Sequence, residues 1–161
     1  MTRLHVPTRV RWSDLDGYRH VNNASMLRLL EEARIDAFWS AGGSAGGSAG
    51  ETSTAAVLDG SPGADTMTLI ARQELEYLLP IPYLRAPLDI QIWVGRLGGA
   101  SLEICYEVRS PVGAEPAQLF TKAATTIVLV EAATGRPRRI SDVERAAWQP
   151  YIEPPLVFRR P

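Results

Sequence analysis

The sequence predicts an α+β fold in which one early helix is followed by strands that pair as hairpins. From about Ala24 to Trp39 the apolar side chains recur at helical spacing, which is typical of a helix with one buried face. The later part of the chain instead alternates apolar and polar residues in runs separated by Gly and Pro, as antiparallel strands do. A helix first and a group of hairpin strands afterwards is the order of elements expected of an α+β protein.

Strands are expected where this alternation is regular. The first precedes the helix, over residues 3–12. Gly98-Gly99 separates two of the later strands and predicts a hairpin turn. A short helix capped by Ser141, with Glu144 completing a capping box, is expected near the end of the chain. The later strands are predicted at residues 67–79, 88–97, 102–109 and 117–130.

The predicted helix has a broad apolar face and a polar start. A stripe of this width indicates a helix that lies against the concave face of a sheet. Arg34 falls within the apolar arc and can pair with Glu31 one turn earlier. Asn22 and Asn23 precede the stripe and are good N-cap residues. The stripe consists of Met26, Leu29, Leu30, Ala33 and Ala37.

Composition and charge exclude several classes of protein. The formal net charge is −1, so nothing points to nucleic acid or an anionic membrane surface. No apolar stretch approaches the ~20 residues of a membrane span, and the N-terminus lacks the apolar core of a signal peptide. Cys105 is the only cysteine, which excludes an internal disulfide and, in a strand-like run, favours a core residue over a nucleophile. We expect one domain over residues 1–161, in a cytoplasmic protein that binds neither nucleic acid nor membrane.

A Gly/Ser-rich segment interrupts the predicted elements over residues 41–66. It begins AGGSAGGSAG, a composition that cannot pack a core and predicts a flexible loop. The run contains G-x-S-x-G twice, around Ser44 and Ser48, which is also the pattern of a serine-hydrolase nucleophile elbow. That elbow requires a strand before it and a helix after it. This segment follows a helix, so we interpret it as a loop.

The polar turn before the helix gathers the residue types of a catalytic site. Residues 14–23 read DLDGYRHVNN, with two carboxylates, a histidine and two amides between a strand and the helix. The N–H groups at a helix N-terminus carry about half a positive charge and suit an oxyanion. A carboxylate beside such donors is an arrangement that acyl transfer can use.

This turn and the helix after it carry a family resemblance. The pattern D-x-D-x-x-x-H-V-N-N at residues 14–23 is followed by E-x-A-R at 31–34 and LEYLLP at 75–80. In this order the motifs resemble the hotdog-fold acyl-CoA thioesterases of the 4-hydroxybenzoyl-CoA thioesterase type. The resemblance implies a long helix wrapped by an antiparallel sheet, assembled as a homodimer or a dimer of dimers. It also implies hydrolysis of an acyl-CoA or acyl-carrier-protein thioester to free acid and thiol.

The resemblance assigns roles within the turn. Asp16 matches the catalytic aspartate and would either attack the thioester carbonyl or activate a water, two routes that stay open. The backbone N–H of Asn23 would polarise the thioester oxygen. His20 would order the turn by hydrogen bonding rather than act as a base. Asp14 is the structural alternative, since an aspartate in a turn commonly bonds turn amides.

Substrate binding is expected from three arginines and a tyrosine. By the resemblance, Arg138 would contact a phosphate of coenzyme A, and Arg136 and Arg139 could assist. Tyr77, at the end of a predicted strand, is the fourth candidate for substrate binding. The hairpin at 98–100 lacks the basic residues of the relative, which permits an acyl-carrier-protein thioester. No metal and no cofactor are expected, apart from coenzyme A as part of the substrate.

Other functions stay open from the sequence. One is a non-catalytic hotdog module that binds an acyl thioester or serves in assembly. A weaker one is a hotdog hydratase, which usually needs an Asp/His pair over the acyl α-carbon, and the adjacent V-N-N argues against it. A second hotdog lineage carries its catalytic carboxylate on the helix, but Glu31 and Glu32 are better interpreted as a solvated or interfacial face. The acyl chain length is not predicted.

Overall fold

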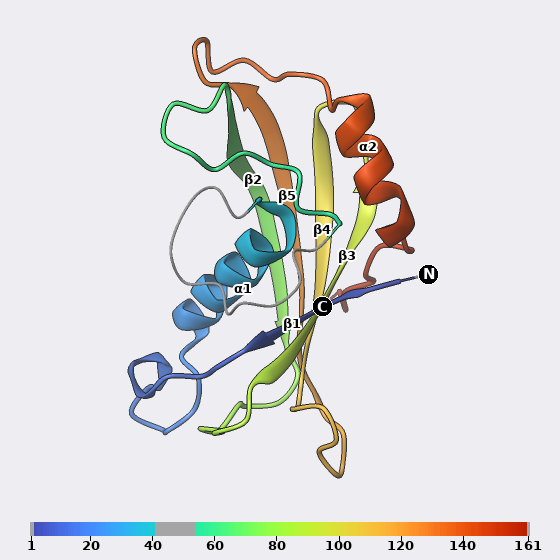
Figure 1. Cartoon of the computed structure of the whole chain (residues 1–161). Coiled ribbons are helices and arrows are strands. Elements are labelled where there is room, and N and C mark those ends of the chain that lie inside the picture. The colour runs from blue at the N-terminus through green and yellow to red at the C-terminus, as the bar shows by residue number, and fades with distance from the viewer. Residues whose placement is uncertain (1, 41–53, 161) are drawn as a thin grey trace.

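The computed structural model describes residues 2–40 and 54–160 of the chain. Five strands, two α-helices and two short 3-10 helices make up this part (Figure 1). The Gly/Ser run predicted at 41–50 lies outside the described residues. The strands are β1 (Leu4–Thr8), β2 (Thr66–Tyr77), β3 (Leu88–Leu97), β4 (Ser101–Arg109) and β5 (Leu119–Glu131). The helices are α1 (Asn23–Phe38) and α2 (Asp142–Trp148), and the 3-10 helices are Trp12–Asp14 and Gln149–Tyr151.

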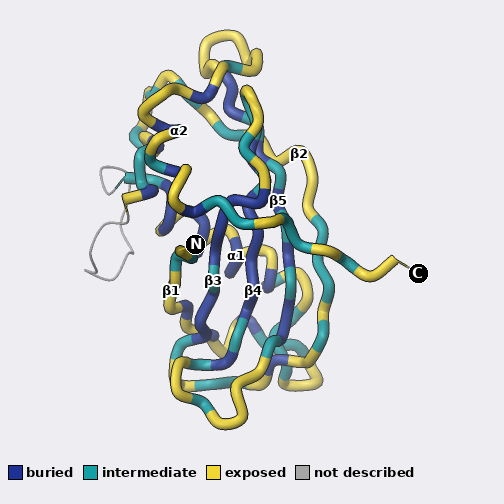
Figure 2. The backbone as a smooth tube through the Cα atoms, turned by 90° about the vertical axis from the view of Figure 1, so that its right-hand side faces the viewer, coloured by how far each residue is buried: buried dark blue, intermediate teal, exposed yellow. Residues whose placement is uncertain are grey.

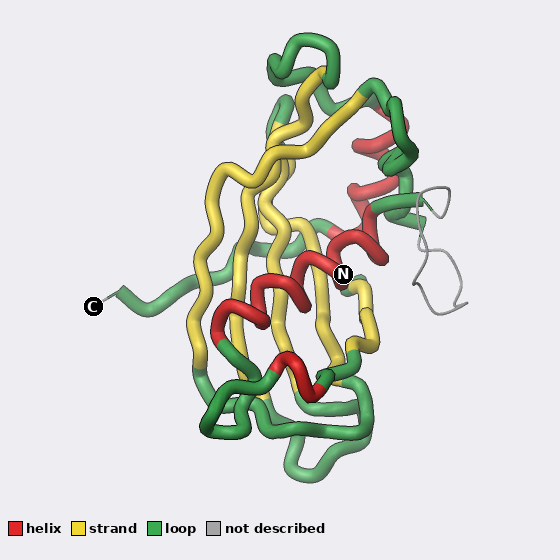
Figure 3. The backbone as a smooth tube through the Cα atoms, turned by 90° about the vertical axis from the view of Figure 1, so that its left-hand side faces the viewer, coloured by secondary structure: helices red, strands yellow, loops and turns green. Residues whose placement is uncertain are grey.

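The five strands form one antiparallel sheet in the order β1-β3-β4-β5-β2. Helix α1, 16 residues long, lies across one face of this sheet (Figure 3). One long helix against an antiparallel sheet is the hotdog arrangement that the resemblance implies, so the predicted fold is confirmed. Within the described residues, β1 and β2 are the two edge strands. Neither α-helix in this part of the chain is long and apolar enough to span a membrane.

The core lies between α1 and the sheet. The predicted apolar stripe is confirmed, since all five of its residues are buried. Trp148 of α2 closes one end of the core, with its ring edge-on to Phe38 at a centroid distance of 6.1 Å. The central strands β3 and β4 are buried on both faces (Figure 2). The C-terminal segment covers the outer face there, because the Trp93 indole N–H donates to the Pro154 carbonyl at 3.1 Å.

The chain leaves its first strand earlier than the sequence predicts. β1 ends at Thr8 rather than at residue 12, and Trp12 begins a 3-10 helix with 71% of its surface exposed. The cause is Asp14, whose carboxylate accepts a hydrogen bond from the Arg11 N–H at 2.7 Å and so bends the chain. Trp12 stacks instead on Tyr83, with ring centroids 4.3 Å apart. The predicted strand is therefore too long at its C-terminal end.

Part of the predicted loop is packed where the structure describes it. Leu58 forms a β-bridge with Trp39, and Leu58 and Ala55 are both buried in the core. The Trp148 indole N–H donates to the Ala55 carbonyl at 3.0 Å. These residues differ from the flexible loop expected over 41–66, because two apolar side chains in a polar stretch reach the core. Thr66, the last residue of that range, already belongs to β2.

Arg34 does not form the ion pair with Glu31 that its spacing allows. Its side chain is only 4% exposed, and Nη1 donates to the Tyr106 hydroxyl at 3.0 Å. Because its stripe position faces the sheet, the side chain reaches β4 rather than lying along the helix surface.

Candidate active site

The turn between β1 and α1 folds back on itself as a small hairpin. Leu15 and Val21 form an antiparallel bridge, and the Asn22 N–H donates to the Asp14 carbonyl at 2.7 Å. The Asp16 N–H donates to the His20 carbonyl at 2.9 Å. These bonds place Asp16 beside the residues that lead into α1.

Asp16 is held by one of its two carboxylate oxygens. Oδ1 accepts from the Tyr18 N–H at 2.8 Å and from the His20 N–H at 3.3 Å. Among the described residues, Oδ2 has no hydrogen-bond partner, and the residue is half-buried. The turn therefore fixes the direction of the carboxylate and leaves one oxygen open.

Asp14 has a different environment. It is 3% exposed, and both of its carboxylate oxygens accept hydrogen bonds. Oδ2 accepts from the Arg11 N–H and Nε, at 2.7 and 3.3 Å, and Oδ1 accepts from Nη2 at 3.1 Å. Its partners and its burial are those of a residue that shapes the turn, as the sequence suggests.

The first turn of α1 offers an open donor. Asn22 is the N-cap, and its side chain accepts from the Ala24 N–H at 2.8 Å, as predicted. The Asn23 side chain accepts from the same N–H at 3.0 Å. The N–H of Asn23 itself has no partner among the residues that the structure describes, as expected at the start of a helix. A carbonyl oxygen placed there would receive a hydrogen bond and the positive end of the helix dipole.

Tyr77 connects the end of β2 to this helix start. Its hydroxyl donates to the Asn23 carbonyl at 2.9 Å. Partial burial raises the pKa of Tyr77 above its usual value, so the phenol stays protonated and donates. The structure thus brings together two of the predicted site residues, Tyr77 and Asn23.

An apolar pocket opens beside the helix start, between α1, the end of β2 and β5. Its volume is about 260 Å³. The Val21 N–H donates to the Ile81 carbonyl at 2.8 Å and ties the turn to the pocket wall. The wall contains one threonine hydroxyl and one phenol in an otherwise apolar surface. The lining residues are Val21, Met26, Tyr77, Leu78, Leu79, Pro80, Ile81 and Thr121.

His20 contributes through its main chain. Its N–H and carbonyl both bond Asp16, and it forms a β-bridge with Pro82. Within the described chain its ring makes no hydrogen bond. The ordering of the turn that the sequence predicts for His20 therefore comes from the backbone, and the imidazole itself stays free.

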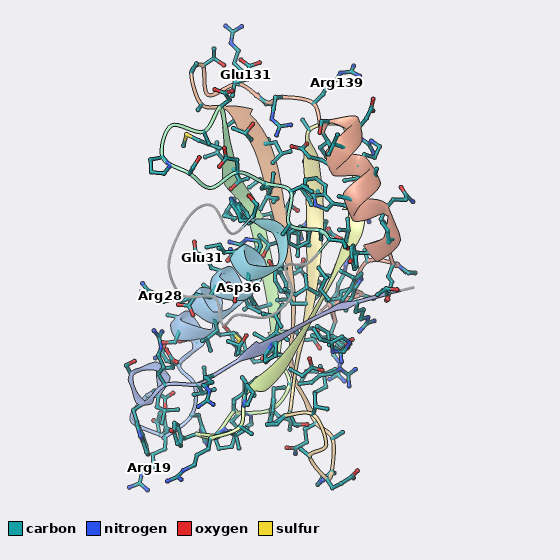
Figure 4. The ribbon with its side chains drawn as sticks, in the orientation of Figure 1. Arg19, Arg28, Glu31, Asp36, Glu131 and Arg139 are labelled. Atoms are coloured by element: carbon teal, nitrogen blue, oxygen red, sulfur yellow. The ribbon has the colours of Figure 1, made fainter. Side chains whose placement is uncertain are left out.

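The predicted phosphate-binding arginines lie elsewhere. Arg139 is at the far end of the sheet from Arg19, which belongs to the Asp16 turn (Figure 4). Arg138 is engaged internally, because its guanidinium donates to both Glu144 oxygens, to Thr66 Oγ1 at 2.7 Å and to the Arg139 carbonyl at 2.8 Å. Arg136 is exposed, and its carbonyl accepts from the Glu131 N–H at 2.8 Å. One chain does not bring these arginines to Asp16.

Two further groups can be assigned. Cys105 is fully buried in β4, and burial raises the pKa of its thiol to about 11, which disfavours the nucleophilic thiolate. No three His, Cys, Asp or Glu side chains of residues 2–40 and 54–160 gather as a metal site would require.

Thr121 is the pocket residue that sequence reasoning missed. The sequence does not single it out, because the same strand parity carries a second hydroxyl at Thr125 beside Ala123, Ile127 and Leu129.

The five-stranded antiparallel sheet with helix α1 across one face is a hotdog fold. A family model described as the thioesterase-like superfamily matches residues 10–148. The chain belongs to this thioesterase-like superfamily. A comparison with curated proteins finds no match.

Solved structures show the same fold at low sequence identity. The PA2801 protein from Pseudomonas aeruginosa is 27% identical, with a TM-score of 0.66 over 90% of this chain and 95% of that chain. YbaW, a probable thioesterase from Escherichia coli, is 23% identical, with a TM-score of 0.63 over 94% of this chain and 98% of that chain. A thioesterase-superfamily protein from Jannaschia sp. CCS1 is 22% identical, with a TM-score of 0.71 over 94% of both chains.

Proposed function

We propose that this protein hydrolyses an acyl thioester of coenzyme A or of an acyl carrier protein, releasing a free acid and a thiol. Membership of the thioesterase-like superfamily supports hydrolysis of a thioester in general. The observation that carries the specific proposal is that one turn, which borders an apolar pocket through Val21, presents both an open Asp16 oxygen and an open Asn23 N–H. The pocket would hold the acyl chain, and the N–H would receive the thioester carbonyl oxygen.

Two chemical routes fit these groups. On the covalent route, Asp16 attacks the carbonyl carbon, the carbon–sulfur bond breaks, and the thiolate leaves and takes up a proton from water. Water then hydrolyses the acyl–aspartyl anhydride and restores the carboxylate. On the other route, Asp16 removes a proton from a water as that water attacks the same carbon. The carbon–sulfur bond then breaks, and Asp16 returns the proton to the sulfur, which leaves as the thiol. In both, charge develops on the carbonyl oxygen, where the Asn23 N–H would stabilise it.

The proposal is tested by mixing the purified protein with a panel of short-chain and aromatic acyl-CoA thioesters. A thioesterase releases free thiol over many turnovers. A non-catalytic acyl-binding module would instead show heat of binding in calorimetry and no thiol. The same panel presented on an acyl carrier protein distinguishes the two carriers.

The proposed assembly is a homodimer through the edge strand β2. This strand is 12 residues long, and in the described sheet it pairs only with β5. Long unpaired edges attract further strands and are normally covered. Its exposed apolar side chains would be buried by a second copy: Met67, Leu69, Ile70 and Tyr77 are 52%, 48%, 45% and 52% exposed. Tyr77 links this edge to the site, so the pocket would lie beside the partner subunit. If Arg136 and Arg139 contact a phosphate of coenzyme A, the site must be assembled from more than one chain.

Light scattering at micromolar concentration should therefore give at least twice the 17.6 kDa mass of one chain. Leu69→Arg places a charge in the middle of the proposed interface and should shift the protein toward monomer with loss of activity. Val112→Arg, at an exposed apolar residue outside β2 that is 88% exposed, serves as the matched control. A wild-type monomer with full hydrolytic activity would contradict the shared-site assembly.

A further inference from the structure

Thr121 carries an unexplained hydroxyl. The residue is 1% exposed, and its Oγ1 is the one buried side-chain polar atom in the described chain without a hydrogen-bond partner. A buried polar group without a partner is destabilising, and natural proteins rarely keep one without a reason. On the same strand face, Ala123 and Ile127 are apolar, and the hydroxyl of Thr125, which is also buried, is not among the unpaired atoms. Valine, which has nearly the same shape, would fill this position in the core without that loss.

The position of Thr121 ties it to the proposed site. It lines the 260 Å³ pocket and stands opposite Tyr77 in the β2–β5 register. The Tyr77 hydroxyl in turn bonds the Asn23 carbonyl in the first residue of α1. Neighbouring strands lie ~4.8 Å apart. An acyl group whose carbonyl oxygen meets the Asn23 N–H and whose chain enters this pocket would have Thr121 as part of the wall around it.

The rest of the pocket wall offers such a group few polar contacts. Met26 from α1 and Leu78, Pro80 and Ile81 from the connection after β2 are apolar. The pocket volume lies below the ~300–1,000 Å³ typical of drug-sized ligand sites. The pocket therefore suits a short acyl group. Of its two lining hydroxyl groups, the Tyr77 phenol already bonds the Asn23 carbonyl, and the Thr121 hydroxyl is the one left without a partner.

We propose that Thr121 is a specificity-determining residue that hydrogen-bonds an oxygen substituent, hydroxyl or carbonyl, close to the thioester carbon of a short acyl group. The inference rests on the proposed function, since the same pocket holds the acyl chain. The expected substrates are therefore short oxygenated acyl thioesters rather than plain fatty acyl thioesters. A site built around a buried polar group discriminates against analogues that leave the group unpaired.

The experiment compares substrates of equal chain length with matched variants. The substrates are butyryl-CoA, each enantiomer of 3-hydroxybutyryl-CoA, and acetoacetyl-CoA. Wild-type kcat/KM should be higher for at least one oxygenated substrate than for butyryl-CoA. Thr121→Val should lower kcat/KM for that substrate about tenfold and change the butyryl-CoA value by less than about twofold, because it removes one hydrogen bond and keeps the shape. Thr121→Ser, which keeps the hydroxyl, should retain the preference.

The thermal midpoint is the readout for a purely structural role. Loss of an unpaired hydroxyl should leave the midpoint of Thr121→Val unchanged or raise it. Equal loss of activity on all substrates, or the wild-type preference retained in Thr121→Val, would overturn the proposal while leaving hydrolysis intact. If the wild type hydrolyses none of these substrates, the proposed function fails instead. In that case the dissociation constants of the wild type for the same acyl-CoA thioesters test the subsite. Tighter binding of an oxygenated thioester than of butyryl-CoA that Thr121→Val abolishes supports the subsite, and equal dissociation constants for the two reject it.

Discussion

Asp16→Asn should lower thiol release by at least about a hundredfold while leaving the fold intact. The amide oxygen of asparagine can still accept the hydrogen bonds that Asp16 Oδ1 accepts from the Tyr18 and His20 N–H groups. The substitution changes the open oxygen into an NH₂ group, which is neither a nucleophile nor a base. Loss of such a group commonly costs two or more decades in rate. The expected change in thermal midpoint is within about 2 °C, as for a change that breaks no buried contact.

Asp14→Asn is the matched control for this prediction. It removes the charge two residues away, where both oxygens bond Arg11 and the side chain is buried. Because Arg11 is half-exposed and screened by solvent, the expected loss of stability is about 1–2 kcal/mol. At a temperature where the variant is folded, its kcat should stay near the wild-type value. Retention of most of the wild-type turnover in Asp16→Asn would remove Asp16 from the mechanism.

Asn23→Pro should reduce kcat by about a hundredfold or more, because it removes the N–H proposed to hold the carbonyl oxygen. Loss of one such donor typically costs 10²–10³ in rate. Proline is favoured at the first position of a helix. Asn22 already has the extended conformation, φ −61° and ψ 140°, that a residue before proline requires. The helix should therefore form normally, and the Asn23 carbonyl that accepts from Tyr77 is kept at this position.

Asn23→Ala separates the backbone from the side chain in this test. It keeps the N–H and loses the 3.0 Å side-chain bond to the Ala24 N–H, for which Asn22 also provides an acceptor. Its kcat should remain within a few-fold of wild type. Circular dichroism and the thermal midpoint establish that both variants are folded. Wild-type kcat in a folded Asn23→Pro variant would show that this N–H does not stabilise the transition state.

Features with a strong local signal could be predicted from the sequence. The strand at 88–97 is observed as β3 with the same bounds, because its alternation is uninterrupted and glycines end it. The N-cap Asn22 and the Ser141–Glu144 capping box are also observed as predicted. In each case the deciding interaction joins residues a few positions apart, which a sequence displays directly.

Features decided by distant contacts could not be predicted. Ala55 and Leu58 look like loop residues by composition, but they are buried by partners more than ten positions away. The guanidinium of Arg138 resembles a phosphate ligand until Glu144 and Thr66 are seen to occupy its donors. Thr121 shows the same limitation, because an unpaired hydroxyl can be recognised only when its surroundings are known.

The candidate site was predictable in part. The turn that contains Asp16 and the helix start at Asn23 follow from one contiguous stretch of sequence and its family resemblance. The distinction between Asp14 and Asp16, one saturated and one with an open oxygen, is shown by their hydrogen bonds. The pocket wall comes from residues 77–81 and β5, far along the chain, and only the fold brings these segments to the turn.

The central claim is that this site breaks a thioester bond, and the most direct test is thiol release from a short acyl-CoA by the purified protein. Butyryl-CoA is suitable because its chain fits a pocket of about 260 Å³. We expect one free thiol and one butyrate for each thioester consumed, over many turnovers, with the rate lost in Asp16→Asn. Saturable binding of oxygenated and plain short acyl-CoA thioesters, with no thiol released from any of them by the wild type, would contradict the claim and identify a binding module instead.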